Sequence, residues 1–201
     1  MKAYVTLAFL IIILTCKAQK LTLTPGQSAP AFSLINVDGK TFSFENYPLA
    51  KGFILVFTCN TCPYSKAYEQ RINNLNNAYA SKGFPVIAIN PNDPTASPGD
   101  SFEKMKQHAR TAGFTFPYLY DKNQMATMAY GAKNTPQVFL ISKTTGGNVI
   151  EYTGAIDSDT QNIDPNKKLF LEDAINALLK NEKPTRAVTR AIGCTVKWKK
   201  S

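Results

Sequence analysis

Residues 53–66 read FILVFTCNTCPYSK, and this stretch decides the fold. Its first five residues are all apolar, as expected for a central β-strand that is covered on both faces. Cys59 and Cys62 follow, two residues apart. Pro63 suits the first turn of a helix, where the missing N–H costs nothing. The stretch therefore predicts a buried strand, a short loop with two cysteines and a helix.

Strands and helices alternate along the rest of the chain. Asp38-Gly39 predicts the turn of a β-hairpin between about 32 and 44. Hydrophobic periodicity gives the other elements. The predicted strands are 53–57, 84–90, 138–142 and 148–154, and the predicted helices are 63–82, 101–111, 125–130 and 169–180. This order predicts an α/β fold with a mixed central β-sheet flanked by helices.

Composition and charge limit the classes of function that this chain can have. The chain has 201 residues, of which 44% are hydrophobic and 18% are charged, as in an ordinary globular protein. The formal net charge is +9, but the basic residues are dispersed apart from Lys197, Lys199 and Lys200. Because no basic stripe with interleaved aromatic residues is present, we expect no nucleic-acid partner.

The N-terminal residues 1–18 have the layout of a secretory signal peptide, with Lys2 ahead of a short apolar run. Cleavage after Ala18 would release a soluble exported domain, which we favour. Residues 13–16, ILTC, also resemble a lipoprotein box that is cleaved before Cys16 and lipidated there, although Thr15 stands where a smaller residue is usual. Both routes predict an exported protein, either periplasmic or membrane-anchored, in a compartment where disulfides persist.

One domain is expected over 25–201, with a tail at 181–201 that has no strong pattern and few apolar residues. After processing, the domain keeps Cys59, Cys62 and Cys194. An odd number of cysteines in an exported protein calls for a free thiol or a changing disulfide partner. Cys194 is either a small buried residue under the tail or a third redox cysteine, and the sequence leaves both readings open.

The Cys59–Cys62 pair has three readings. A zinc site normally takes four Cys or His ligands, and the remaining candidates, Cys194 and His108, are isolated in the sequence; we therefore expect no metal. A structural disulfide stabilises more when it closes a longer loop. A redox couple fits the position best, because the unpaired N–H groups at a helix N-terminus stabilise a thiolate. We expect a lowered pKa at Cys59, with Cys59 attacking and Cys62 resolving.

Thr135-Pro136 precedes the predicted strand at 138–142. On the sequence alone, an ordinary trans proline before a strand is the simpler reading. A cis bond, which proline permits at modest cost, would turn the Thr135 backbone toward a passing peptide. In that case Thr135 and Pro136 would bind the substrate.

The strand, CxxC and helix of 53–80 and the Thr135-Pro136 pair resemble the thioredoxin fold. Together with PGQSAPAFSL, YGAKNTPQVFLI, EYTGAID and GCTVKWK, they make residues 25–200 similar to a bacterial thioredoxin-like branch of the alkyl hydroperoxide reductase/thiol-specific antioxidant superfamily. The resemblance implies a thioredoxin-like fold with an insert at roughly 85–120. It also implies thiol redox chemistry at Cys59 and Cys62, and a cis Pro136.

Some positions depart from the related motifs. Thr58 replaces the Trp of the thioredoxin motif, and Asn60-Thr61 replace its Gly-Pro, which leaves the redox potential open. Peroxiredoxins place Thr three residues before the reactive Cys, whereas Val56 precedes Cys59 by that offset and Cys59 itself precedes Cys62.

We therefore expect a thiol-disulfide oxidoreductase, with a peroxiredoxin-like peroxidase and a non-catalytic binding module as alternatives. No cofactor is expected beyond the redox-active disulfide. The expected partners are proteins or small molecules that carry thiols or disulfides, together with a separate electron donor or acceptor.

Overall fold

The structure is a computed structural model that describes residues 21–200. The predicted signal peptide at 1–18, and Cys16 within it, lie outside the described residues. Within residues 21–200, no helix combines the length and the apolar character needed to cross a membrane.

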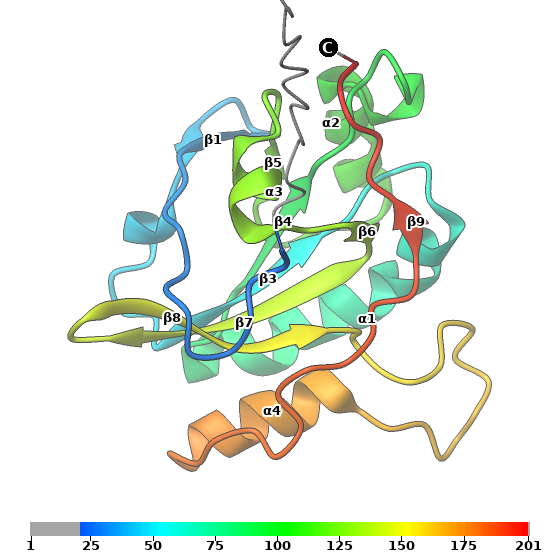
Figure 1. The fold of residues 1–201 in the computed structure, drawn as a ribbon. Helices are drawn as coiled ribbons and strands as arrows, with labels where there is room; N and C mark the ends of the chain where they lie inside the picture. Colours follow the sequence, from blue (N-terminus) through cyan, green and yellow to red (C-terminus); the bar gives the residue numbers. More distant parts are fainter. Residues whose placement is uncertain (1–20, 201) are drawn as a thin grey trace, which may run out of the picture.

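A seven-stranded mixed sheet forms the centre, in the order β2-β1-β5-β4-β3-β7-β8 (Figure 1). Strands β3, β4 and β5 are parallel, whereas β7 runs antiparallel to β3 and β8 antiparallel to β7. The strands are β1 Leu34–Asn36, β2 Thr41–Phe42, β3 Gly52–Phe57, β4 Val86–Asn90, β5 Tyr118–Tyr120, β7 Gln137–Thr144 and β8 Gly147–Gly154. A separate two-stranded sheet pairs β6 Asn134–Thr135 with β9 Cys194–Thr195.

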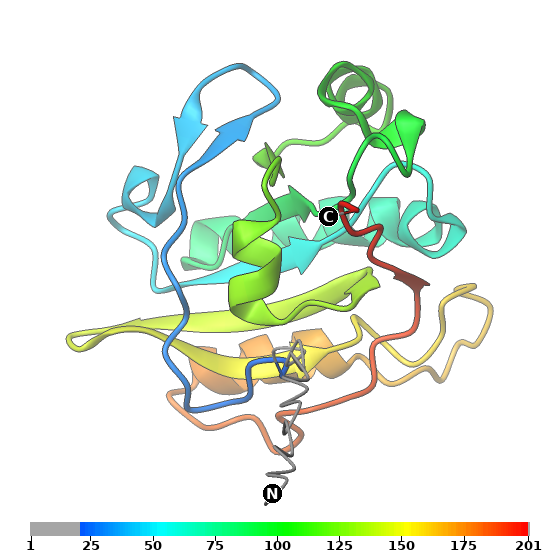
Figure 2. The same cartoon turned by 45° about the horizontal axis from the view of Figure 1, so that its top comes forward.

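Helices cover both faces of the sheet (Figure 1 and Figure 2). The α-helices are α1 Pro63–Tyr79, α2 Phe102–Thr111, α3 Met125–Tyr130 and α4 Phe170–Leu179. Short 3-10 turns occur at Phe44–Asn46, Ala80–Lys82 and Pro98–Asp100. Helices α1, α2 and α4 pack on one face and α3 on the other.

Strand β3 divides two hydrophobic cores. Its even positions, Ile54 and Val56, pack with the buried faces of α1 and α4. Its odd positions, Phe53, Leu55 and Phe57, pack on the opposite side of the sheet with α3 and the N-terminal segment. Every residue of β3 is buried. The apolar run of the sequence is therefore explained by burial on both faces.

The predicted α/β fold is confirmed, element by element. The hairpin, the four predicted strands and the four predicted helices all occur, with bounds that differ by a few residues. The first helix is shorter than expected, because α1 ends at Tyr79 and a 3-10 turn follows before Gly83. The strands β5, β6 and β9 were not among the strands predicted from the hydrophobic pattern.

Because β3 is buried on both faces, truncating one of its side chains should cost much folding stability. We expect Leu55→Ala to lower the free energy of unfolding by about 2–5 kcal/mol, because Leu55 is completely buried and its loss leaves a cavity. Leu49→Ala is the matched control, since Leu49 is 93% exposed and should change stability little. Urea unfolding of both variants measures the difference. Equal midpoints would contradict the assignment of Leu55 to the core.

Candidate active site

The two cysteines of the CxxC segment lie where the C-terminal end of β3 meets the N-terminus of α1. Both are free thiols, and each is only 3% exposed. Thr135 of β6 faces them: its hydroxyl Oγ1 lies 3.2 Å from the Cys59 Sγ, and its carbonyl oxygen lies 3.1 Å from the Cys62 Sγ. The structure therefore brings the predicted residues Cys59, Cys62 and Thr135 into one buried cluster.

Cys62 occupies the N-cap position of α1, with Pro63 as the first helical residue. A hydrogen bond from the Cys59 thiol lowers the pKa of Cys62 to about 4, and burial opposes this shift. Hydrogen bonds from the Cys194 thiol and from the backbone N–H groups of Ser65 and Cys194 are smaller contributions to the same lowering. The Cys62 thiol, when protonated, donates to the Thr135 carbonyl at 3.1 Å, and the lowered pKa makes Cys62 the more readily ionised thiol of the pair.

Cys59 has the opposite electrostatic environment. Its hydrogen bond to Cys62, its burial and the negative charge of Asp100 all raise the pKa of Cys59, and the Thr135 hydroxyl only partly offsets them. The predicted lowering of the pKa at Cys59 is therefore wrong. The main physical reason is the hydrogen bond between the two thiols, which lowers the pKa of Cys62 and raises that of Cys59; burial and Asp100 add to the rise at Cys59.

A buried carboxylate fixes the loop between the two cysteines. Asp100 is completely buried, and no cationic partner of it is present within residues 21–200. Burial raises its pKa, but hydrogen bonds from its neighbours outweigh burial and lower the pKa overall. The donors to the carboxylate are the Asn60 N–H at 2.7 Å, the Thr61 hydroxyl at 2.8 Å, the Ser97 hydroxyl at 2.6 Å, and the Asn92 and Asn90 amides at 2.9 and 3.2 Å.

The sequence analysis missed Asp100. It lies in a polar loop that gives no indication of burial, and its partners Asn60 and Thr61 were noted only as departures from the thioredoxin motif. One pattern could have pointed to it: Asn90 is a polar residue at the end of an otherwise apolar strand, and a buried amide requires a partner.

The Thr135-Pro136 peptide bond is cis, as the family resemblance implied. Both residues are buried, and the backbone of Thr135 pairs with Cys194 in the β6–β9 ladder. The backbone edge that was predicted to bind a substrate strand is thus covered by the chain's own tail (Figure 1).

Cys194 joins the cluster from the tail. It is half-buried and contacts Cys62, although 132 positions separate the two in the sequence. Burial and the hydrogen bond to Cys62 raise the pKa of Cys194 to about 11. No group of three or more His, Cys, Asp or Glu side chains suited to a metal ion occurs between residues 21 and 200.

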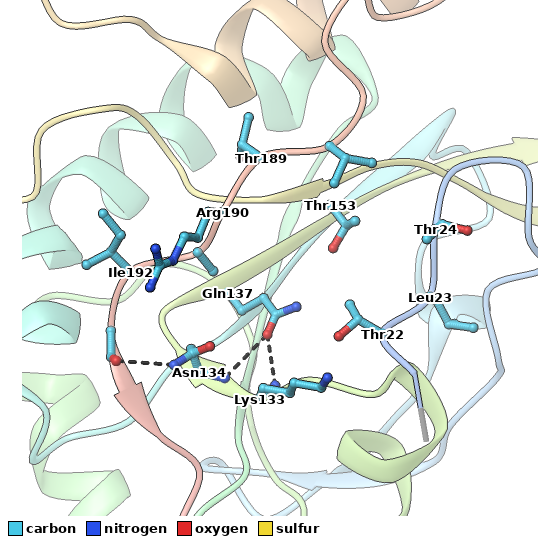
Figure 3. A pocket seen from close by; sticks show the side chains of 13 residues that line it. Thr22, Leu23, Thr24, Lys133, Asn134, Gln137, Thr153, Thr189, Arg190 and Ile192 are labelled. Carbon is cyan, nitrogen blue, oxygen red and sulfur yellow. Dashed lines mark hydrogen bonds between the residues drawn. The ribbon is translucent and has the colours of Figure 1, made fainter. Parts of the chain in front are cut away.

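A cavity of about 390 Å³ opens beside the cluster (Figure 3). Asn134 and Gln137, which flank Thr135-Pro136, lie on one side of it, and the tail residues Arg190 and Ile192 lie on the other. Neither cysteine of the CxxC segment lines this cavity.

Comparison with known proteins places this chain in a family. A Mycobacterium tuberculosis protein provisionally named a peroxiredoxin is 31% identical over 139 residues, which are 68% of this chain and 80% of that protein. The thiol-disulfide oxidoreductase ResA of Geobacillus thermodenitrificans is 27% identical over 62% of this chain and 67% of its own length.

Solved structures agree with this placement. An uncharacterized conserved protein of Geobacillus kaustophilus has a TM-score of 0.81 and 35% identity, covering 88% of this chain and 93% of that one. A Chlorobium tepidum protein provisionally named thiol:disulfide interchange protein DsbE has a TM-score of 0.52 and 25% identity, covering 64% of this chain and 84% of its own.

The fold is therefore thioredoxin-like, with thiol redox proteins among its relatives. Residues 25–153 match the AhpC/TSA family, and the chain belongs to that family. The match includes both cysteines of the CxxC segment and Thr135, whereas Cys194 and the tail lie beyond it.

The position of the thiolate can be tested by absorbance at 240 nm between pH 3 and 8. In reduced protein with Cys16→Ser, we expect one thiolate signal that persists from pH 8 down to about 5 and disappears near pH 4, because the pKa of Cys62 is lowered from its ordinary value of 9.0. Cys62→Ser should abolish this signal. Because the pKa of Cys62 is lowered in the folded protein, its thiolate stabilises the reduced fold at higher pH. This contribution to stability is lost as the pH falls through the lowered pKa.

If the signal survives in Cys62→Ser and disappears in Cys59→Ser, the thiolate belongs to Cys59 and the assignment is wrong.

Asp100→Asn should both destabilise the protein and change the thiols. We expect the free energy of unfolding to fall by on the order of 3 kcal/mol, because several buried donors lose a charged acceptor. The pKa of Cys59 should also fall, since a neighbouring negative charge is removed. Asp38→Asn, in the exposed hairpin turn, is the control and should change neither quantity. Unaltered unfolding and thiol titration in Asp100→Asn would contradict this role.

Proposed function

We propose that this protein is an exported thiol-disulfide oxidoreductase that uses Cys59 and Cys62 as a redox couple on protein or small thiol substrates. The proposal is supported by the opposite electrostatic environments of Cys59 and Cys62, which lie in one buried cluster. One thiol has fixed hydrogen-bond donors that stabilise its anion, and the other keeps its proton. A thiolate nucleophile beside a protonated thiol is the arrangement that thiol-disulfide exchange requires.

The electrostatics reverse the roles that the sequence analysis expected. The Cys62 thiolate attacks a sulfur of the substrate disulfide and forms a mixed disulfide, releasing the other substrate sulfur as a thiol. Cys59 then loses its proton and attacks Cys62. The products are a Cys59–Cys62 disulfide and a fully reduced substrate, and the two electrons come from the couple. The reverse sequence oxidises a dithiol substrate.

Thr135 positions both sulfurs in this reaction. Its hydroxyl is 3.2 Å from Cys59, so it can donate a hydrogen bond to the anion that forms there when the proton leaves. Its carbonyl is 3.1 Å from Cys62 and accepts a hydrogen bond from that thiol in its protonated state. The peptide-binding role of Thr135 and Pro136 remains part of the proposal, and it requires the tail to move away from Thr135.

Export remains part of the proposal and rests on the signal-like residues 1–18, with Cys16 as the candidate lipid anchor. In such a compartment the couple needs a separate electron donor or acceptor, either soluble or in the membrane. A thiol carrier of this kind is the expected recycling partner, and no further cofactor is required.

The reduction potential is the decisive measurement. The stabilised thiolate favours the reduced couple, so we expect a value less negative than about −270 mV, which is typical of thioredoxin. Glutathione titration of the wild type gives the value, and insulin reduction with dithiothreitol tests turnover. In a chain that also carries Cys194→Ser, so that no other thiol can resolve the adduct, Cys59→Ser should trap a mixed disulfide at Cys62, and Cys62→Ser should trap none. No reversible two-thiol transition would leave a non-catalytic binding module as the better explanation.

A peroxidase is the second candidate, because the Mycobacterium tuberculosis relative is provisionally named a peroxiredoxin. In that case the Cys62 thiolate would reduce a hydroperoxide and become a sulfenic acid, which Cys59 would resolve with loss of water. Hydrogen peroxide consumption with dithiothreitol separates the two functions. Peroxide consumption without insulin reduction would favour the peroxidase.

A further inference from the structure

The redox couple is closed off from solvent by the tail. Cys59 and Cys62 are each 3% exposed, yet any electron donor must reach one of them. Cys194 of the tail is half-buried, and its backbone pairs with Thr135, whose carbonyl oxygen lies 3.1 Å from the Cys62 Sγ. Thr195 and Lys197, which follow it, are exposed.

The tail lies where a substrate strand would lie. Cys194 pairs antiparallel with Thr135, so β9 takes the backbone edge that an incoming extended peptide would use. This pairing places Cys194 beside Thr135, whose carbonyl oxygen lies 3.1 Å from the Cys62 Sγ, and the Cys194 thiol is among the groups that lower the pKa of Cys62. The tail therefore imitates a bound substrate.

The tail is anchored on both sides of Cys194. Before it, the side-chain amide of Asn134 donates to the Gly193 carbonyl at 3.2 Å. After it, Val196 is buried and its N–H donates to the Lys133 carbonyl at 3.0 Å. Further hydrogen bonds join Lys197 to Asp93, Asn92 and Gln124, and Lys199 to Gln124. The tail has few apolar residues, and backbone pairing together with side-chain amides holds it instead.

Gly193 permits this close docking. A Cβ at position 193 would collide with the carbonyl of Thr135 and with the nitrogen of Pro136. Only a glycine allows the tail to lie directly on the Thr135-Pro136 peptide. The cavity of Figure 3 lies along the same tail segment, with Ile192 and Gly193 in its wall.

We propose that Cys194 is a third catalytic thiol, which takes over the disulfide from the buried couple and presents it near the surface. The proposal rests on the proposed function for its starting state, the Cys59–Cys62 disulfide. Cys194 is thereby an internal disulfide partner, and external thiols meet Cys194 before they meet Cys59 or Cys62.

The exchange balances without an added oxidant. Cys194 loses its proton and attacks the Cys62 Sγ. The Cys59–Cys62 bond breaks, the Cys62–Cys194 bond forms, and Cys59 leaves as a thiolate that takes up the proton. An external thiol reductant then attacks Cys194 and forms a mixed disulfide, releasing the Cys62 thiolate. A second external thiol completes the reduction and leaves all three cysteines reduced.

The charges of the cluster favour this order. In the reduced protein, Cys194 keeps its proton because of burial and because it donates to the Cys62 thiolate. Oxidation of the couple removes that negative charge, while Lys197 still favours the Cys194 anion. Cys194 therefore becomes a better nucleophile when a disulfide is present for it to attack.

The test is disulfide mapping on the full chain with Cys16→Ser. Cys59→Ser, oxidised with glutathione disulfide, should give a monomer with a Cys62–Cys194 bond and no bound glutathione. This bond is identified by peptide mass spectrometry without reduction. A stable glutathione adduct on Cys62 with Cys194 still free would overturn the proposal.

Two matched variants separate exchange from chance oxidation. Cys194→Ser with Thr195→Cys, again in Cys59→Ser, moves the thiol by one residue to the other face of β9, and its glutathione adduct should persist. Gly193→Val keeps every thiol but displaces the tail, and should slow formation of the Cys62–Cys194 bond at least tenfold. Equal rates with and without Gly193→Val would contradict the role of docking.

A third comparison distinguishes this proposal from the proposed function. Insulin reduction and the two-thiol transition report on Cys59 and Cys62. If both persist while Cys194 stays free throughout oxidation, the proposed function stands and the third thiol is rejected. If the Cys62–Cys194 bond forms and the wild type shows the two-thiol transition but does not reduce insulin, the third thiol stands and the proposed oxidoreductase function is rejected.

Discussion

A thiolate kept away from water at Cys62 requires fixed hydrogen-bond donors, and much of the local structure supplies them. Cys62 is placed at the N-cap of α1, so the N–H of Ser65 points toward its sulfur. Cys59 and Cys194 donate from two other segments. Since a buried anion without donors would simply take up a proton, the ends of β3, α1 and β9 must all meet at this point.

A second buried anion lies on the other side of the loop. Asp100 binds Asn60 and Thr61, the two residues between the cysteines, and thereby fixes the backbone that presents both sulfurs. Its charge also opposes ionisation of Cys59. The charge of this carboxylate thus adds to the difference between the two thiols, after their mutual hydrogen bond and burial.

The sequence predicted the sheet well because its information is local. The apolar run at 53–57 and the periodicity of 68, 72, 75 and 79 depend only on which faces are buried. The CxxC pair was found for the same reason. Asp100 and the docking of Cys194 were not, because both depend on contacts between distant segments: the carboxylate meets Asn60 across 40 positions, and β9 returns to β6. The predicted pKa of Cys59 failed on a smaller scale, since it depended on the hydrogen bond between the two thiols and on the charge of Asp100.

The position of β9 in the chain has a consequence for folding. The central pairings already join distant residues, such as Leu55 and Phe139, so the sheet forms through long loop closures. Strand β9 comes after every strand of that sheet. Because a chain emerges from its N-terminus during synthesis, the CxxC segment is made long before the residues that cover it. For that interval the nascent molecule carries an open pair of thiols, and completion of the polypeptide closes them off.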